Sequence, residues 1–261
     1  MQKKNLLTYL SFAHYVTDKA TETLINNYKS KSFFSSKKKV ASAYELVTDI
    51  DSQIENTVRK HIIKRFPEHN ILGEELGEVN SNSDFTWIID PIDGTKAFVS
   101  GIPVFTFLLS LKYKNNYILG VVDQPLLKER YWNFNNKAYL NKKIIKTRKC
   151  QSFLEATIAI TEPQMFSDFN KINNNIFRKF NFIRWGTDAL GYMRCAEGII
   201  DGVIERNIKI WDVAAIEPII NNAGGIISTW DGKKIGSNDT VCASGDKKLH
   251  NLLVNSLQNY I

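Results

Sequence analysis

Apolar side chains recur at helical spacing in two early stretches of the chain. In the first thirty residues the spacing is loose, with Leu10 and Leu24 among the apolar positions. A regular period of four follows over residues 50–66, and Pro67 stands directly after it. These patterns predict two helices, of which the second ends at the proline. The Lys- and Ser-containing residues 30–42 between them are predicted to form a loop.

The middle of the chain consists of β-rich segments separated by polar residues. An apolar run, Trp87-Ile88-Ile89, ends in Asp90, and Pro91 is expected to stop further strand pairing because it has no N–H. Further β-rich segments lie at residues 104–113, 117–123 and 129–134. Asn115-Asn116 predicts a hairpin turn between the first two. With a polar loop at residues 78–84, this pattern indicates an antiparallel sheet.

Beyond about Lys146, predicted strands alternate with predicted helices. The strands are residues 157–161 and 199–205, and the helices are residues 188–197 and 212–223. Pro218 should kink the last helix, which closes at Gly224-Gly225. Alternation of strand and helix is typical of an α/β architecture. We therefore expect an α+β protein with two closely packed halves: an α+β half, residues 1–145, and an α/β half, residues 146–261.

Composition indicates an ordinary globular protein with a basic surface. The 261 residues are 43% hydrophobic and 23% charged, and the formal net charge is +7. The lysines are spread along the chain, which favours a solvated surface over a nucleic-acid-binding patch. Their positive charge would attract an anionic substrate. Three widely separated cysteines predict no disulfide framework. Because no signal peptide or membrane span is recognised, we expect a cytoplasmic location and no membrane partner.

Carboxylates at four places are candidates for metal chemistry. Asp90 and Asp93 follow an apolar strand closely, and like charges so near each other call for a cation between them. Glu74 and Asp212 lie in other segments. Oxygen ligands without His or Cys favour Mg²⁺ or Mn²⁺ over Zn²⁺. Two such ions about 3.5–4 Å apart can clamp a phosphate, and the Gly94-Thr95 turn would present backbone N–H groups to it.

Taken singly, each of these residues also has a simpler explanation. Glu74 could be a solvated loop charge, and Asp212 could be a helix N-cap. Asp51 could be the capping-box partner of Thr48. The segment from Asp90 to Gly94 could be a calcium-like turn or an ordinary loop. Signatures of serine or cysteine nucleophiles and of the Gly-x-x-x-x-Gly-Lys phosphate loop are absent from the sequence.

Three motifs in combination resemble the signature set of the inositol monophosphatase superfamily. They are Gly73-Glu74-Glu75, then Trp87-Ile88-Ile89-Asp90-Pro91-Ile92-Asp93-Gly94-Thr95, then Trp211-Asp212-Val213-Ala214-Ala215 followed by Ala223-Gly224-Gly225. Their order and spacing match over about residues 46–232. The resemblance implies a layered α-β-α-β-α fold and a Mg²⁺-dependent phosphomonoesterase of the kind that is typically sensitive to lithium.

The resemblance also implies a metal-binding role for five residues. Glu74, Asp90 and the carbonyl of Ile92 would hold a first ion. Asp90, Asp93 and Asp212 would hold a second, which would stabilise the departing alkoxide. Mg²⁺ is the expected ion, and Mn²⁺ is the alternative.

Further roles follow from the same resemblance. Glu74 and Thr95 would orient the attacking water, with Asp90 as the third catalytic residue, and Gly94 and Thr95 would cradle the phosphate. Asp51 would lie near a weaker third ion. The upstream lysine of the family is left unassigned among Lys37, Lys38 and Lys39.

Other segments bear on the choice of phosphate ester. Lys96, the segment Arg184-Trp185-Gly186-Thr187-Asp188 and Glu205 resemble the histidinol-phosphate phosphatases of the superfamily, although Thr187 stands where that subfamily usually has a second glycine. Arg184, Asp188 and Glu205 are therefore candidates for binding substrate. Acidic side chains would suit the ammonium and imidazole of histidinol phosphate. A helix cap at Asp188 and a surface charge at Glu205 are the simpler alternatives.

The reaction implied is hydrolysis of L-histidinol phosphate to L-histidinol and phosphate, a step of histidine synthesis. The rival substrates are inositol monophosphate, another sugar phosphate and 3′-phosphoadenosine 5′-phosphate. A non-enzymatic alternative is a binding protein of the same fold that associates with RNA or transcription machinery. Relatives are commonly homodimers, so we expect a homodimer. We expect its partner to be a small phosphorylated metabolite and not a nucleic acid.

Overall fold

The first two helices lie side by side on one face of the molecule. The computed structural model describes residues 3–30, 36–38 and 46–261, with side chains described over 5–28 and 49–261. Helices α1 (Lys3–Ser30) and α2 (Asp49–Arg65) occupy the two stretches of predicted helix. Between them, β1 (Ser36–Lys38) pairs with β2 (Leu46–Thr48), so the predicted loop is wrong at residues 36–38. Ser30, the first residue of that predicted loop, is the last residue of α1. Residues 31–35 and 39–42, and the side chains of Thr48 and the three lysines, lie outside what is described.

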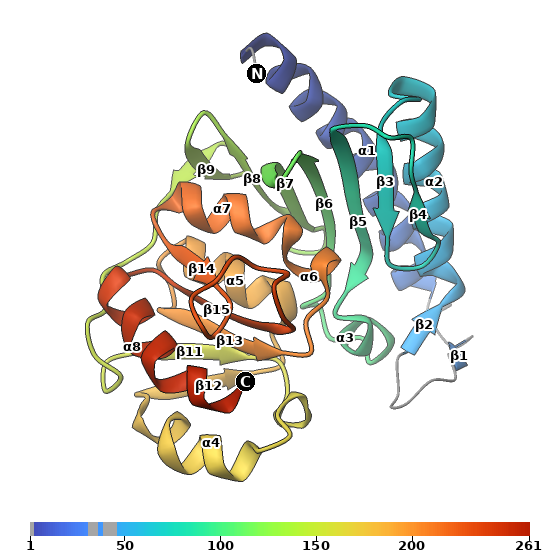
Figure 1. Ribbon diagram of the computed structural model, residues 1–261. Helices are drawn as coiled ribbons and strands as arrows, with labels where there is room; N and C mark the ends of the chain where they lie inside the picture. The colour runs from blue at the N-terminus through green and yellow to red at the C-terminus, as the bar shows by residue number, and fades with distance from the viewer. Residues whose placement is uncertain (1–2, 31–35, 39–45) are drawn as a thin grey trace.

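A large sheet forms the centre of the N-terminal half (Figure 1). It has eight strands in the order β10-β9-β8-β7-β6-β5-β3-β4. Their bounds are β3 (Asn70–Gly73), β4 (Gly77–Val79), β5 (Phe85–Asp93), β6 (Thr106–Tyr113), β7 (Asn116–Gln124), β8 (Glu129–Phe134), β9 (Lys137–Leu140) and β10 (Lys143–Ile145). Only β3 and β5 pair in parallel. The predicted antiparallel sheet is thus confirmed apart from that pair.

Three details of this sheet differ from the sequence expectation. Strand β4 lies partly in the predicted polar loop, at the exposed edge of the sheet. The hairpin turn is Lys114-Asn115, because Tyr113 already pairs with Asn116. Strand β5 continues beyond Pro91, because a bulge between Asp90 and Asp93 takes the proline out of the ladder before pairing resumes.

A second, mixed sheet forms the centre of the C-terminal half. Its order is β12-β11-β13-β15-β14, with β11 parallel to both neighbours and the other pairs antiparallel. The strands are β11 (Thr157–Ile160), β12 (Phe182–Trp185), β13 (Gly202–Arg206), β14 (Ile226–Ser228) and β15 (Thr240–Ser244). The helices α4 (Phe169–Asn175), α5 (Asp188–Ala196) and α8 (Lys247–Leu257) accompany them. The predicted helix at residues 188–197 is confirmed, whereas the predicted strand at 199 begins three residues later.

The predicted helix at residues 212–223 is two helices. Helix α6 (Ile210–Ala214) ends at Ala215, and α7 (Ile216–Ala223) starts directly after it. Pro218 is the third residue of α7, where the backbone N–H has no partner within the helix in any case. The proline therefore follows a helix start instead of kinking a continuous helix. Gly224, with φ of 98°, terminates α7 as predicted.

The elements stack in layers. Helices α1 and α2 cover one face of the large sheet, α5, α6 and α7 lie between the two sheets, and α8 packs on β14 and β15 (Figure 1). Buried side chains of α1 and α2, including Val16, Ile54 and Ile62, join Trp87 of β5 in the N-terminal core. This is a layered α+β fold. None of the helices in the described part of the chain is apolar over a length that would span a bilayer.

Candidate active site

A cavity of about 180 Å³ lies where elements of the two halves meet. It is smaller than the roughly 300–1,000 Å³ of pockets for drug-sized ligands, which suits a small metabolite. Six acidic side chains line it: Glu74, Asp90, Asp93, Asp188, Glu205 and Asp212. The other lining residues are Ile92, Gly94, Thr95, Thr161, Met165, Ala189, Tyr192, Asn207 and Ile208. Four segments that are distant in the sequence thus supply one acidic site.

Glu74 and Asp90 meet because β3 and β5 run in parallel. Gly73 pairs with Ile89, so the residues that follow them lie at the same edge of the sheet. Asp90 is 2% exposed, and its Oδ1 has no hydrogen-bond partner. Burial raises the pKa of Glu74 to about 8, and the charge of Asp212 adds to the effect. Burial, reinforced by the charge of Glu74, also holds the pKa of Asp90 well above its usual range.

Asp93 and Asp212 reach the cavity from opposite halves. Asp93 Oδ2 accepts the Ala189 N–H at 2.8 Å, which ties the end of β5 to the start of α5. Asp212 Oδ2 accepts the Lys209 N–H at 2.7 Å and so helps to cap α6. Burial, together with the charge of Asp188, raises the pKa of Asp93 well above its usual range. Asp212 is therefore not the N-cap, which is Lys209, but the third residue of α6, whose side chain accepts the N–H of the N-cap residue. The same residue also lines the site.

The carboxylates share the cavity without converging on one point. In the described residues, no three His, Cys, Asp or Glu side chains form a ready-made metal cluster. Asp93 and Asp212 each accept a backbone N–H, from Ala189 and Lys209 respectively. The donor set nevertheless fits a hard divalent cation, because every candidate donor is oxygen and the buried Asp90 Oδ1 lacks a partner.

The turn after β5 is shaped to approach a ligand closely. Gly94 has φ of 77°, a conformation that favours glycine, and Thr95 begins the short helix α3 (Thr95–Val99). The Thr95 hydroxyl donates to the Ile92 carbonyl at 2.9 Å. A carbonyl oxygen has two lone pairs, so Ile92 can still accept a cation. The Asp188 side chain lies against Gly94, so this carboxylate borders the turn.

Glu55, which the sequence patterns did not single out, holds the turn that carries Glu74. It is buried in α2 and accepts the backbone N–H groups of Glu75 at 2.7 Å and Leu76 at 3.1 Å. Arg59 donates to it at 2.7 Å. A Cβ at Gly73 would overlap the Glu55 carboxylate. A side chain at Gly73 would displace the Glu55 carboxylate from these contacts, so the close approach favours glycine in the Gly-Glu-Glu motif. Only the fold reveals this partner.

The substrate candidates divide between the cavity and the surface. Glu205 is buried and accepts hydrogen bonds from Thr161 and, at 2.8 Å, from Tyr192. Burial raises its pKa to about 7, and burial with the Glu162 charge raises that of Asp188 to about 6. Asp188 also has a strained φ of 45°.

The remaining two candidates lie outside the cavity lining. Arg184 lies on β12 with its side chain exposed and does not line the cavity. Asp51 is buried in the first turn of α2 and is not among the lining residues, but its charge contributes to raising the pKa of Glu74.

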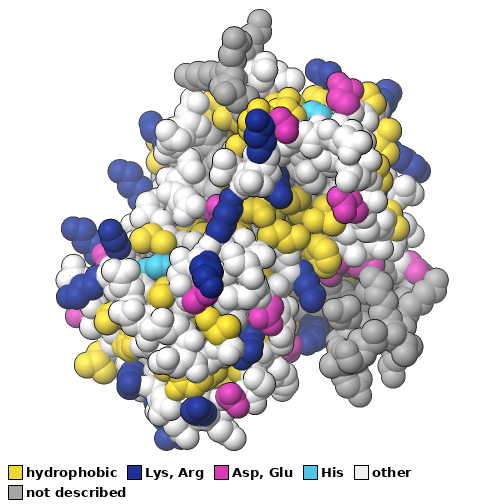
Figure 2. All heavy atoms as spheres, in the orientation of Figure 1, with side chains coloured by type: hydrophobic (Ala, Val, Ile, Leu, Met, Phe, Trp, Pro, Cys, Tyr) yellow, Lys and Arg dark blue, Asp and Glu magenta, His cyan; other side chains and the backbone are white. Residues whose placement is uncertain are grey.

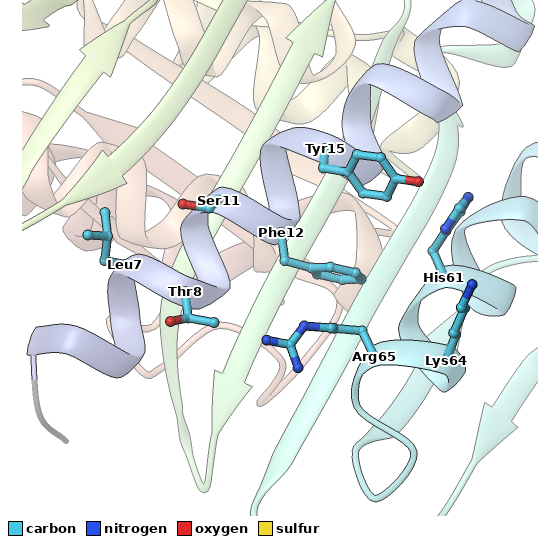
Figure 3. Close-up of a pocket in the computed structure, with 8 residues that line it drawn as sticks. All are labelled: Leu7, Thr8, Ser11, Phe12, Tyr15, His61, Lys64 and Arg65. Atoms are coloured by element: carbon cyan, nitrogen blue, oxygen red, sulfur yellow. The ribbon is translucent and has the colours of Figure 1, made fainter.

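A larger hollow lies elsewhere, between α1 and α2. It has a volume of about 690 Å³, and Leu7 is among the residues that line it. Figure 3 shows Phe12 and Tyr15 of α1 pointing toward α2, which contributes His61, Lys64 and Arg65. None of its described lining residues is acidic. This groove is the larger of the two hollows. The raised pKa values of the carboxylates in the smaller cavity nevertheless indicate that the smaller cavity is the reactive site.

The chain is similar to proteins of a known phosphatase family. Residues 5–261 match the inositol monophosphatase family. A bifunctional phosphatase IMPL2 of Arabidopsis thaliana is 36% identical over 225 residues, which cover 81% of this chain and 65% of that protein, so the match spans just under two thirds of that relative. A fructose-1,6-bisphosphatase/inositol-1-monophosphatase of Aquifex aeolicus is 32% identical over 223 residues, covering 83% of each.

Other relatives have names of two further kinds. A histidinol-phosphatase of Chlorobaculum parvum is 29% identical and covers 72% of this chain and 74% of its own. A Nus factor SuhB of Haemophilus influenzae is 32% identical and covers 85% of each. Among solved structures, an inositol monophosphatase of Thermotoga maritima superposes with a TM-score of 0.86 at 27% identity, covering 97% of this chain and 98% of its own. The chain belongs to the inositol monophosphatase family, and it is a phosphomonoesterase of that family.

Proposed function

We propose that this phosphomonoesterase acts with two Mg²⁺ ions held by the acidic residues of the cavity. Glu74, Asp90 and the Ile92 carbonyl would hold one ion, and Asp90, Asp93 and Asp212 the other. When bound, the ions polarise the phosphate, activate water and stabilise the leaving oxygen. The unpartnered Oδ1 of the buried Asp90 is the observation that carries the metal site. A third ion near Asp51 remains a weaker extension of the proposal.

The chain's own groups position the reactants. The Thr95 hydroxyl donates its proton to the Ile92 carbonyl, so its lone pairs face outward to accept from a water. Glu74, on the neighbouring turn, accepts the other proton of that water. The backbone N–H groups of Gly94 and Thr95 receive phosphate oxygens. Water and phosphate are thereby held from two strand ends for in-line attack.

For the substrate we propose L-histidinol phosphate, which yields L-histidinol and phosphate. The support is the partly buried Asp188 and the buried Glu205, which both lie on the wall that the C-terminal half contributes. A buried carboxylate is costly unless a cation pairs with it. The ammonium or imidazolium of histidinol phosphate would provide that cation, whereas a neutral polyol would not. Relatives named histidinol-phosphatase are consistent with this choice.

The first prediction is tested with a panel of esters and Mg²⁺. We expect kcat/KM for histidinol phosphate to exceed those for inositol 1-phosphate and 3′-phosphoadenosine 5′-phosphate. Asp90→Asn should reduce turnover at least about 100-fold, because it removes a ligand shared by both ions. The exposed Asp84→Asn is the control, since Asp84 lies at the far end of β5. A tenfold preference for inositol 1-phosphate would reject the substrate, and full activity of Asp90→Asn would reject the metal site.

An RNA- or transcription-associated role is the alternative from another class. It is supported by relatives named Nus factor SuhB and by the net charge of +7. On the face shown in Figure 2, Lys and Arg side chains are dispersed among acidic ones and do not form one continuous patch, which favours the catalytic role alone. Salt-dependent RNA binding at micromolar protein would support the alternative. Homodimerisation and lithium inhibition are also proposed, from the family resemblance. A cytoplasmic location is proposed from the sequence, in which no signal peptide or membrane span is recognised.

A further inference from the structure

An ion pair joins the two halves beside the cavity. Lys96 follows Thr95 in α3, and its Nζ lies 2.6 and 2.8 Å from the two carboxylate oxygens of Glu162. Glu162 follows Thr161, the residue whose hydroxyl contacts Glu205. The Lys96 side chain is 55% exposed and that of Glu162 is 32% exposed, so both remain accessible to solvent. Neither residue is among the proposed metal ligands.

The charges of this pair act on Asp188, one of the two carboxylates proposed to face the leaving group. The negative charge of Glu162 raises the pKa of Asp188, and the positive charge of Lys96 lowers it. Both charges therefore reach the side chain that lies against Gly94. The described residues lining the cavity include six carboxylates and no Lys or Arg. Lys96 is thus a positive charge held at the edge of an otherwise acidic site.

We propose that the Lys96–Glu162 ion pair sets the charge selectivity of the site toward the leaving group of the ester. Glu162 favours a cationic leaving group, and Lys96, tethered by Glu162, opposes it. With both present their fields largely cancel, and removal of either leaves the other acting alone. The inference rests on the proposed phosphatase reaction, but it concerns the ratio between two esters and not the identity of the natural one.

The test compares histidinol phosphate, which has a cationic leaving group, with inositol 1-phosphate, which has a neutral one. Lys96→Met should raise the ratio of kcat/KM values for the cationic over the neutral ester by about three- to tenfold, and Glu162→Gln should lower it by a similar factor. The double variant should return close to the parent ratio. In about 1 M salt, where the Debye length is about 3 Å, both shifts should shrink.

Opposite signs distinguish this role from a purely structural tether. If the pair only held α3 against the segment after β11, both single variants would lose activity on both esters alike. Lys114→Met and Asp84→Asn are matched controls, because Lys114 and Asp84 form an exposed pair 3.7 Å apart that does not line the cavity. Lys114→Met changes the net charge by the same amount as Lys96→Met, and Asp84→Asn by the same amount as Glu162→Gln. Both controls should leave the kcat/KM ratio unchanged.

Each outcome separates the inference from the proposal it rests on. Equal ratios in the parent, Lys96→Met and Glu162→Gln overturn the inference while the phosphatase proposal stands. Shifts of the same sign, or equal shifts in the controls, also overturn it. A parent that prefers inositol 1-phosphate but shows the two opposite shifts rejects the proposed substrate and supports the inference. A parent that hydrolyses neither ester overturns both.

Discussion

The charge on Glu74 depends on what shares its cavity. Burial disfavours its ionised form, and the neighbouring Asp212 and Glu75 make ionisation harder still. The family resemblance of the three motifs predicted that carboxylates would gather here, and Glu74, Asp90, Asp93 and Asp212 all line the cavity. It could not predict how deeply each is buried, because burial comes from side chains contributed by both sheets.

Ion-free protein should lose stability as the pH rises because of Glu74. Its pKa is about 8 in the folded protein against an ordinary 4.5, so the folded state binds the proton more tightly. The stabilisation is complete below about pH 4.5 and is lost as the pH approaches 8. In chelator, the Tm of the parent relative to Glu74→Gln should fall between pH 5 and pH 8.

Added Mg²⁺ should reverse this trend. Because ionised carboxylates bind the cation, the rise in Tm on adding Mg²⁺ should be larger at pH 8 than at pH 5. Glu74→Gln should show a smaller rise at both values. A Tm difference between parent and variant that is flat with pH, or that grows as the pH rises in chelator, would contradict the assignment.

At the scale of elements, the loop after β3 is held from outside its own sequence neighbourhood. The Gly-Glu-Glu motif is readable in the sequence, but its anchor Glu55 lies on α2 and looks like an ordinary polar position there. In the same way, apolar spacing predicted one helix over residues 212–223, whereas one helix ends and another begins at Ala215. Periodicity reports which face of a segment is buried, and it does not reveal where one helix ends and the next begins.

Replacing Glu55 should weaken metal binding at a distance. In Glu55→Gln, the amide NH₂ would face backbone N–H donors, and the ion pair with Arg59 would be lost. A buried unsatisfied donor costs about 1–3 kcal/mol, so we expect a loss of stability in that range. The Kd for Mg²⁺, measured by calorimetry, should rise severalfold because the turn bearing Glu74 loosens. Glu78→Gln on the exposed β4 is the matched control, and equal Kd values for the two variants would refute the role.

At the scale of the whole molecule, the site exists only where the two halves touch. Helices α6 and α7 pack closely against the large sheet. A Cβ on Gly120 of β7 would overlap the Ala215 carbonyl, and the Ser110 hydroxyl donates to the Ala214 carbonyl at 2.9 Å. Asp212 lies in α6, two residues before Ala214. The contact that joins the halves therefore also places the most distant proposed metal ligand.

Gly120→Ala should separate these layers. Because its Cβ would meet backbone and not a flexible side chain, the helices must move, and we expect a loss of at least about 2 kcal/mol in the free energy of unfolding. Phosphatase activity of the folded fraction should also fall, since Asp212 is displaced. Denaturant unfolding and activity at matched folded fractions would test this. Parent-like values of both would show that the contact does not position the site.

The sequence by itself determined the chemistry and the family: a set of carboxylates with one glycine-threonine turn, spaced along the chain as in the inositol monophosphatases. It also determined most strands and helices, because the alternation of apolar and polar positions reports local burial. The tertiary structure alone decided which of the remaining candidates join the four predicted carboxylates in the cavity. It placed Asp188 and Glu205 in the cavity and left Arg184 outside it. It also brought Glu55, Glu162 and Gly120 into contact with partners distant in the sequence. The physical reason is that burial and electrostatic interaction depend on distance in space, and the packing of two sheets around shared helices sets those distances.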